Sequence, residues 1–189
     1  MTLARRETLL LLLPLAGCRS ANPNLYSLVV PPGPALPSGP KVVALRDVSL
    51  AGYLDRQQIV RSSEDYQLTV SENDWWGEPF SGMLTRMLAA ALAQRLPRST
   101  VVGADTAISV TPDATVEIGI QRLDANRAGA VTMAAQIAVS YRRGRRDAVV
   151  QPFTTSVPQD GADARSFVAA ASIAVGRLAD AAASLLQGS

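Results

Sequence analysis

Few residues in this sequence are of the types that perform chemistry in enzymes. Its 189 residues include no His, a single Cys and a single Lys, Lys41. Without His, the chain lacks the side chain that most often serves as a general base or metal ligand near neutral pH. One Cys excludes an internal disulfide and a zinc site built from several Cys ligands. We therefore expect no metal site, no cofactor and no nucleophile activated by His.

Sequence motifs of several common enzyme classes are also missing. The chain contains no G-x-S-x-G turn, no G-x-x-x-x-G-K-[ST] phosphate loop and no G-x-G-x-x-G dinucleotide motif. Carboxylates at Asp47, Asp55, Glu64 and Asp65 could in principle pair for glycoside hydrolysis. We interpret them instead as turn and surface carboxylates. The sequence therefore favours a protein with no catalytic residues.

The basic residues do not indicate nucleic-acid binding. Seventeen of the 18 are Arg, and they are interspersed with 16 acidic residues, for a net charge of +2. The one local cluster surrounds Gly144, with Arg142, Arg143, Arg145 and Arg146. This cluster either contacts phosphates or an acidic partner, or is simply a solvated hairpin tip. No nucleic-acid partner is expected.

The first residues have the layout of a secretory signal. Arg5 and Arg6 precede an apolar run at residues 9–13, and the sequence Leu-Ala-Gly-Cys then ends at Cys18. This ending resembles a bacterial lipobox, which predicts a signal peptide at residues 1–17 and acylation of Cys18. An ordinary signal peptide is the alternative. Cleavage would leave a mature net charge of +1, so acyl chains rather than charge would anchor the protein to a membrane.

A segment rich in proline follows the Cys. Residues 18–40 contain six prolines, which favour extended backbone, so we interpret this segment as an acylated tether with one short strand at residues 25–30. Residues 41–189 then form a single domain, as expected for a chain of this length.

The domain alternates between strands and two amphipathic helices. The clearest helix spans residues 79–96, with Pro79 in its first position and with Arg86, Gln94 and Arg95 on the side opposite its apolar stripe. The second spans residues 163–186, with Asp163 as its N-cap and Gly188 at its C-cap. Strands are expected at residues 41–48, 58–62, 66–71, 101–102 with a continuation at 108–110, 116–121, 131–141 and 149–155.

These elements predict an α+β fold. Two helices would pack on one mixed or antiparallel sheet. Residues 58–62 and 66–71 should form a hairpin, and Pro152 should place the last strand at an edge of the sheet.

Two adjacent tryptophans precede the first helix. Neighbouring side chains usually point in different directions, so we assign Trp76 to the core and leave Trp75 partly exposed. An exposed Trp is a candidate contact for a partner.

Several segments together resemble the ABC-type transport auxiliary lipoproteins, the PqiC-like family. The most specific is Tyr53-Leu54-Asp55-Arg56-Gln57-Gln58-Ile59-Val60, similar to the family's Y-L-D-R-x-Q-I-V. Trp76-Gly77-Glu78-Pro79 is similar to its W-[AG]-E-P, and the lipobox and Tyr26-Ser27-Leu28 also match. The doubled Trp departs from the pattern. Tyr53, Asp55, Arg56 and Trp75 are therefore candidate partner-binding residues, although Asp55 and Arg56 could instead form a buried or half-buried ion pair that fixes a bend.

The resemblance implies a lipid-anchored protein at the periplasmic face of the outer membrane. It would be an accessory subunit without enzymatic activity in an MCE-type lipid transport system. Its partners would be the periplasmic MCE-type protein and its inner-membrane permease, and assembly into a homo-oligomer is left open. Arg19 rather than Asp after Cys18 agrees with outer-membrane sorting. The alternatives are an envelope lipoprotein that regulates or scaffolds a cell-wall or other periplasmic complex, and, less favoured by the motifs, an envelope hydrolase.

Overall fold

The computed structural model describes residues 22–63, 66–104, 106–107, 110–142 and 147–187. The predicted signal peptide, Cys18, the Gly188 cap, residues 108–109 and most of the basic cluster lie outside these ranges. The elements within them are β1 (Asn24–Tyr26), β2 (Val42–Leu45), β3 (Ser49–Leu50), β4 (Gln58–Ser62), β5 (Thr69–Trp76), α1 (Phe80–Arg95), β6 (Thr100–Gly103), β7 (Ala114–Ala125), β8 (Ala130–Tyr141), β9 (Val149–Pro158) and α2 (Ala164–Gln187).

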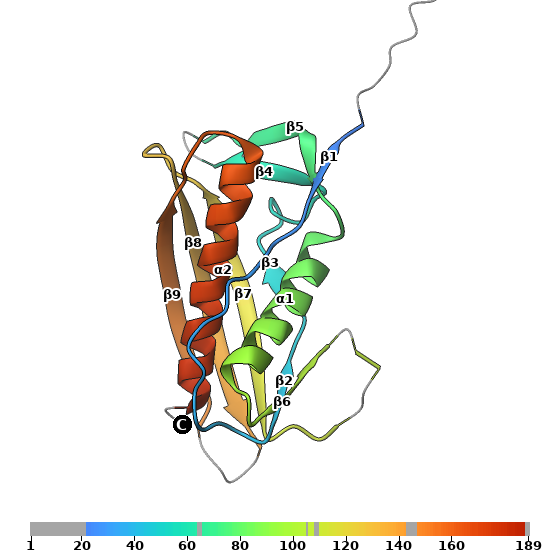
Figure 1. The fold of residues 1–189 in the computed structure, drawn as a ribbon, viewed down its shortest axis with the longest axis vertical. Coiled ribbons are helices and arrows are strands. Elements are labelled where there is room, and N and C mark those ends of the chain that lie inside the picture. The colour runs from blue at the N-terminus through green and yellow to red at the C-terminus, as the bar shows by residue number, and fades with distance from the viewer. Residues whose placement is uncertain (1–21, 64–65, 105, 108–109, 143–146, 188–189) are drawn as a thin grey trace, which may run out of the picture.

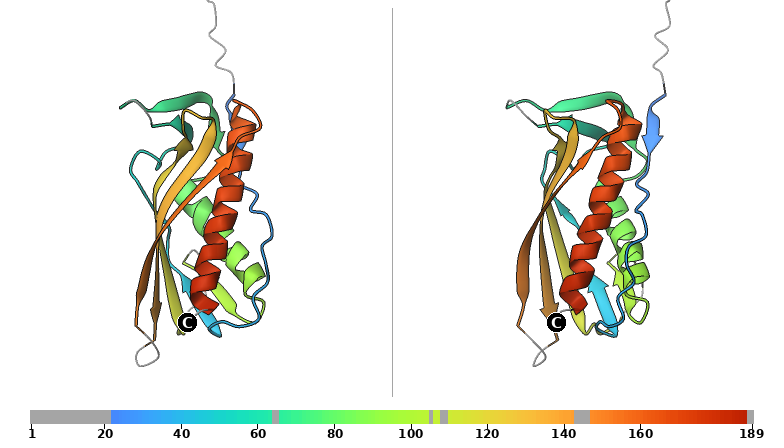
Figure 2. Two further views of the ribbon diagram at one scale, coloured as in Figure 1. Left: turned by 90° about the vertical axis from the view of Figure 1, so that its left-hand side faces the viewer. Right: turned by 60° about the vertical axis from the view of Figure 1, so that its left-hand side comes forward.

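The main sheet is mixed and carries both helices on one face. Its strand order is β6-β2-β7-β8-β9, and β3 also pairs with β7. Strand β2 is parallel to β6 and β7, whereas β7, β8 and β9 are antiparallel neighbours. Figure 2 shows α1 and α2 on the same side of this sheet. The predicted α+β fold is therefore confirmed, and β9, which contains Pro152, lies at the edge as expected.

The core lies between this sheet and the two helices. Side chains alternate along β7 and β8, so that Val116, Ile118 and Ile137 are buried while Glu117 and Gln136 face outward. The buried face of α2 is rich in Ala, which lets the helix approach the sheet closely. This helix is long and apolar enough to cross a membrane, but 61% of its most apolar window is buried inside the fold. Packing on the sheet accounts for its apolar composition.

The ends of the two helices agree in part with the caps predicted from the sequence. Asp163 caps α2, because its Oδ1 accepts a hydrogen bond from the backbone N–H of Ser166 at 2.7 Å, and this bond lowers the pKa of Asp163. Pro79 is the N-cap of α1, with extended backbone at φ −51° and ψ 125°, and not its first helical residue. Leu96 is the C-cap, directly before Pro97.

A smaller sheet lies across one end of the molecule (Figure 1). Its strand order is β1-β5-β4, with β1 parallel and β4 antiparallel to β5. The predicted hairpin is thus confirmed, although its second strand begins at Thr69 and runs to Trp76. Strand β1 is shorter than the predicted strand at residues 25–30. We call the end formed by β1, β4 and β5 the N-terminal end, because the described chain begins there.

Residues 27–40, which we call the strap, run between α1 and α2 (Figure 1). Leu28 is buried in the core, and the backbone N–H of Val29 donates to the Ser172 hydroxyl at 3.1 Å. The boundary predicted at residue 41 is therefore too late, because residues 24–40 are part of the fold. The prolines do keep this segment extended, and most of its residues are exposed, but it lies along the outer side of both helices (Figure 2) and is bonded to them, so it is not a free spacer.

Candidate interaction surface

The two tryptophans lie on opposite faces of β5. Trp76 is buried and stacks on Phe80, with ring centroids 4.3 Å apart and ring planes 6° apart. Trp75 is half-buried, and its Nε1 donates to the backbone oxygen of Glu72 at 3.1 Å. This arrangement agrees with the roles assigned from the sequence. Trp75 thus keeps an accessible indole surface at the N-terminal end.

Asp55 and Arg56 lie in the turn that leads into β4. Both side chains are exposed, so the interpretation as a buried or half-buried ion pair is wrong. Backbone hydrogen bonds hold the bend instead, among them Arg56 N–H to the Leu54 oxygen at 2.9 Å. A further bond joins the Trp76 N–H to the Gln57 oxygen at 2.7 Å and fixes the turn to β5. Asp55 and Arg56 therefore share one end of the fold with Trp75.

Tyr53 faces the main sheet rather than solvent. Its hydroxyl donates to Oδ2 of Asp124 at 3.0 Å, and the Ser63 hydroxyl donates to the same oxygen. Arg122 pairs with Oδ1 of Asp124 at 2.7 Å, so this fully buried carboxylate is well satisfied. Burial, and secondly the charge of Asp124, raise the pKa of Tyr53 to about 12. The phenol of this candidate partner residue is thus engaged inside the molecule.

A buried Arg ties the strap to both helices. Arg95 is only 2% exposed, although its position in the helix predicted a place opposite the apolar stripe. Its Nε pairs with Asp180 of α2 at 2.5 Å, and its guanidinium also donates to the backbone oxygens of Gly176 and Pro31. The strap passes over this side of α1 and excludes water from it, which helical periodicity alone does not reveal.

The side chain of Gln94 adds a second link to the strap. Its amide oxygen accepts from the Gly33 N–H at 2.9 Å, and its amide nitrogen donates to the Gly33 oxygen at 3.0 Å. A methyl group on Gly33 would overlap both the Asp180 carboxylate and the Arg95 guanidinium. The strap can therefore lie this close only because residue 33 has no side chain.

An apolar groove opens between the strap and α2, next to the N-terminal end. It encloses about 520 Å³, which lies in the usual range for ligand pockets. Its sides are formed by Leu25, Tyr26, Ser27, Val29 and Pro31 from β1 and the strap, and by Arg165, Val168, Ala169, Ser172 and Ile173 from α2. Sequence reasoning missed this groove because it treated the strap as a solvated tether.

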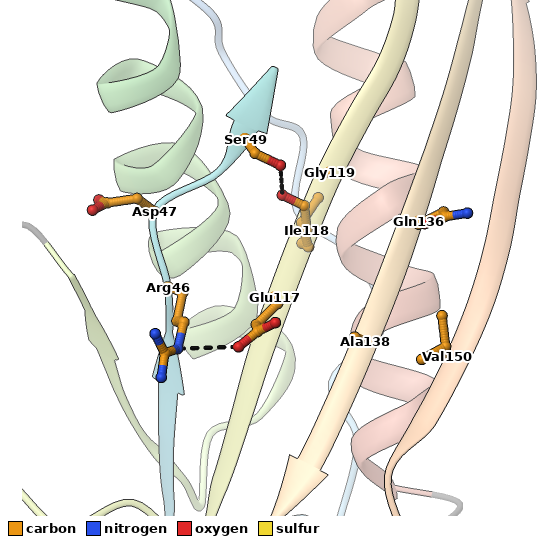
Figure 3. A pocket seen from close by; sticks show the side chains of 9 residues that line it. All are labelled: Arg46, Asp47, Ser49, Glu117, Ile118, Gly119, Gln136, Ala138 and Val150. Carbon is orange, nitrogen blue, oxygen red and sulfur yellow. Dashed lines mark hydrogen bonds and ion pairs between the residues drawn. The ribbon is translucent and has the colours of Figure 1, made fainter. Parts of the chain in front are cut away.

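A smaller hollow of about 390 Å³ lies on the open face of the main sheet (Figure 3). Arg46 pairs with Glu117 at 3.1 Å, both side chains are largely exposed, and Asp47 adds a second carboxylate to the lining. Gly119 and Ala138 leave the centre of the hollow without large side chains. Nothing in this arrangement resembles a nucleophile with its base.

No group of three His, Cys, Asp or Glu that could hold a metal ion occurs among the described residues. In the basic cluster, Arg142 is the only described member, and it pairs with Asp113 at 3.2 Å.

Comparison with known proteins identifies the family. The sequence model of the ABC-type transport auxiliary lipoprotein component matches residues 26–183. The chain belongs to this family. The match begins at Tyr26, in agreement with the inclusion of the strap in the fold. As a member, the chain is a lipoprotein-type auxiliary component associated with ABC-type transport.

Solved structures show the same fold. A protein described only as uncharacterized has 17% sequence identity and a TM-score of 0.74, covering 88% of this chain and 100% of its own. A Xanthomonas campestris protein of the DUF330 family has 18% identity and a TM-score of 0.70, covering 86% of this chain and 94% of its own. No curated protein matches the chain. At these identities, the solved structures support the architecture alone.

Proposed function

We propose that this protein is an outer-membrane lipoprotein that docks the periplasmic component of an MCE-type lipid transport system. Membership of the transport auxiliary family carries the proposal. In this role Cys18 bears the acyl anchor, and the domain supplies a protein-binding surface rather than catalysis. The scarcity of catalytic residue types in the sequence supports a role in binding rather than in catalysis.

The N-terminal end is the docking surface in this proposal. It presents the indole of Trp75 beside the exposed turn of Asp55 and Arg56. Trp and Arg are enriched among the residues that dominate binding energy at protein interfaces, and exposed charges around an aromatic anchor suit a polar rim. Tyr53 acts indirectly, because its bond to Asp124 holds the segment before this turn against the main sheet.

Titration of the purified domain with the MCE-type periplasmic protein tests the proposal. We expect Trp75→Ala to weaken binding by about tenfold or more, equivalent to about 1.4 kcal/mol, without a change in melting temperature. Trp76→Ala should instead reduce stability by about 3 kcal/mol, because it empties the space where Trp76 stacks on Phe80.

Val150→Ala is the matched control for surface truncation, since Val150 is 65% exposed on β9, which belongs to the main sheet and not to the smaller sheet that contains β5. It should bind like the unmodified domain. Normal binding by Trp75→Ala would show that this end is not the docking surface. If Trp76→Ala stays folded but binds poorly, the roles assigned to the two tryptophans are reversed.

A further inference from the structure

We propose that the groove between the strap and α2 holds an acyl chain of a membrane phospholipid, with Arg165 facing the phosphate. The proposal deepens the proposed function and rests on it for the class of lipid. It adds that the auxiliary domain itself takes up lipid, besides docking a protein partner.

The groove leaves large apolar side chains facing solvent. Leu25 is 65% exposed, Val29 77% and Ile173 41%, and all three line this one groove. Large apolar side chains gathered at one concave site indicate a binding surface, whereas single ones scattered over a protein do not. An apolar chain lying here would remove all three from water.

The two ends of the groove differ in polarity. Arg165 lies in the first turn of α2, next to the N-terminal end of the molecule. Ile173 lies eight residues further along the helix. At 1.5 Å per residue, these positions are about 12 Å apart along the axis. A cationic end followed by an apolar trough fits a ligand with an anionic head and a hydrocarbon tail.

The charged groups around Arg165 leave room for such a head. Asp163, which interacts electrostatically with Arg165, is committed to capping α2 through the Ser166 N–H. Arg165 itself is exposed. A guanidinium at the mouth of the groove can donate to phosphate oxygens in a charge-assisted, bidentate manner.

The polar groups in the groove favour a hydrocarbon chain over a peptide. The Ser172 hydroxyl already accepts from the Val29 N–H and donates to the Val168 oxygen. The Tyr26 hydroxyl is engaged with Asp74. A peptide backbone placed here would lose hydrogen bonds to water with few replacements, which is costly. An acyl chain has no such bonds to lose.

The position of the groove gives it access to a membrane. Seven residue steps separate Cys18 from Leu25, which limits their distance to about 25 Å even for fully extended chain. With its anchor inserted, the protein would therefore hold the mouth of the groove near the bilayer surface. Phospholipid is the amphiphile available there at high local concentration.

Photo-crosslinking of the full-length lipoprotein in cells grown with radioactive phosphate tests the proposal. We would replace Ile173 by p-benzoylphenylalanine, irradiate the cells and examine the purified, denatured protein for covalently attached label. We expect light-dependent labelling. The acyl anchor at Cys18 contains no phosphate, so capture of the protein's own anchor would not produce this signal.

Two other positions serve as matched controls for the crosslinker. Val150 is also apolar and is more exposed than Ile173, at 65% against 41%, but it lies on β9. Tyr66 is fully exposed in the turn before β5 at the N-terminal end. Both should remain unlabelled. Labelling at Tyr66 equal to that at Ile173 would mean general contact with the bilayer, and would overturn the assignment to the groove.

Arg165→Glu tests the orientation of the lipid. In the background with the crosslinker at residue 173, we expect this exposed charge reversal to lower labelling by about tenfold, the equivalent of about 1.4 kcal/mol. Undiminished labelling would refute contact between Arg165 and the phosphate. Absence of labelling at Ile173, or a crosslink there to a protein chain, would overturn the lipid proposal as a whole. Because the Trp75 titration measures partner binding separately, either proposal can fail while the other stands.

Discussion

Asp124 connects a segment near the N-terminal end to the main sheet. Its carboxylate is fully buried on β7 and accepts hydrogen bonds from Tyr53 and Ser63, which flank β4, while Arg122 balances its charge. A buried carboxylate is costly unless it is paired and hydrogen-bonded. The network therefore fixes where the segment between residues 53 and 63 lies on the sheet, and with it the turn that contains Asp55 and Arg56.

Tyr53→Phe should lower stability by about 1–2 kcal/mol at pH 7, because it removes one donor from the buried charge. It should also change the alkaline response. The folded protein holds the pKa of Tyr53 near 12 against an ordinary value of 10.0. The unfolded chain thus loses this proton first, and the stabilisation, complete below pH 10, is lost as the pH rises to about 12.

Urea unfolding of a soluble form lacking residues 1–21, repeated from pH 7 to alkaline pH, checks this prediction. The free energy of unfolding should fall less steeply between pH 10 and 12 in Tyr53→Phe than in the unmodified protein. Tyr66→Phe is the control, because the Tyr66 side chain is fully exposed. Equal slopes for Tyr53→Phe and the unmodified protein would contradict the proposed role of the network.

Among the segments of the fold, the strap depends most on close packing against the two helices. Gly33→Ala should force the strap away from Arg95 and Asp180, since the added methyl group overlaps both side chains. Overpacking of this kind costs about 1–3 kcal/mol. We expect a lower melting temperature and faster proteolysis within residues 27–40.

Gly52→Ala is the matched control for this substitution, because nothing lies within 4 Å of the position a Cβ would take at residue 52. It should leave both measurements unchanged. Full protection of the strap in Gly33→Ala would show that the strap does not need this close contact.

The regular elements could be predicted from sequence because their signals are local. The apolar spacing of residues 80–92 defines α1, and the alternation along β7 and β8 defines two central strands. The adjacent positions of Trp75 and Trp76 likewise predicted one buried and one accessible ring. Periods of 3.6 and 2 residues identify these features without knowledge of any neighbour.

Contacts distant in sequence could not be predicted in this way. The partners Tyr53 and Asp124 are 71 residues apart, and Arg95 and Asp180 are 85 apart. The prolines of the strap indicated extended backbone correctly, but not its packing along the outer side of the two helices (Figure 2). The groove lies between the strap and α2, so it depends on that packing and could not be predicted from the sequence either. The exposure of Asp55 and Arg56 could not be predicted either, because it follows from the backbone hydrogen bonds that hold their turn.

At the scale of the whole molecule, the features assigned to function gather at one end. Strand β1, where the described chain begins, pairs with β5 beside Trp75, and the mouth of the groove lies at the adjoining start of α2. The opposite face of the main sheet carries the exposed ion pair between Arg46 and Glu117. This arrangement would place the docking surface and the groove on the side of the domain nearest the acyl anchor.

Identification of the partner tests the central claim most directly. The full-length lipoprotein would be crosslinked in intact cells, purified from outer membranes, and its attached proteins identified by mass spectrometry. We predict recovery of an MCE-type periplasmic protein, and loss of that protein in Trp75→Ala but not in Val150→Ala. Recovery of a cell-wall enzyme or other envelope protein in its place, or purification of the lipoprotein from inner membranes alone, would contradict the account.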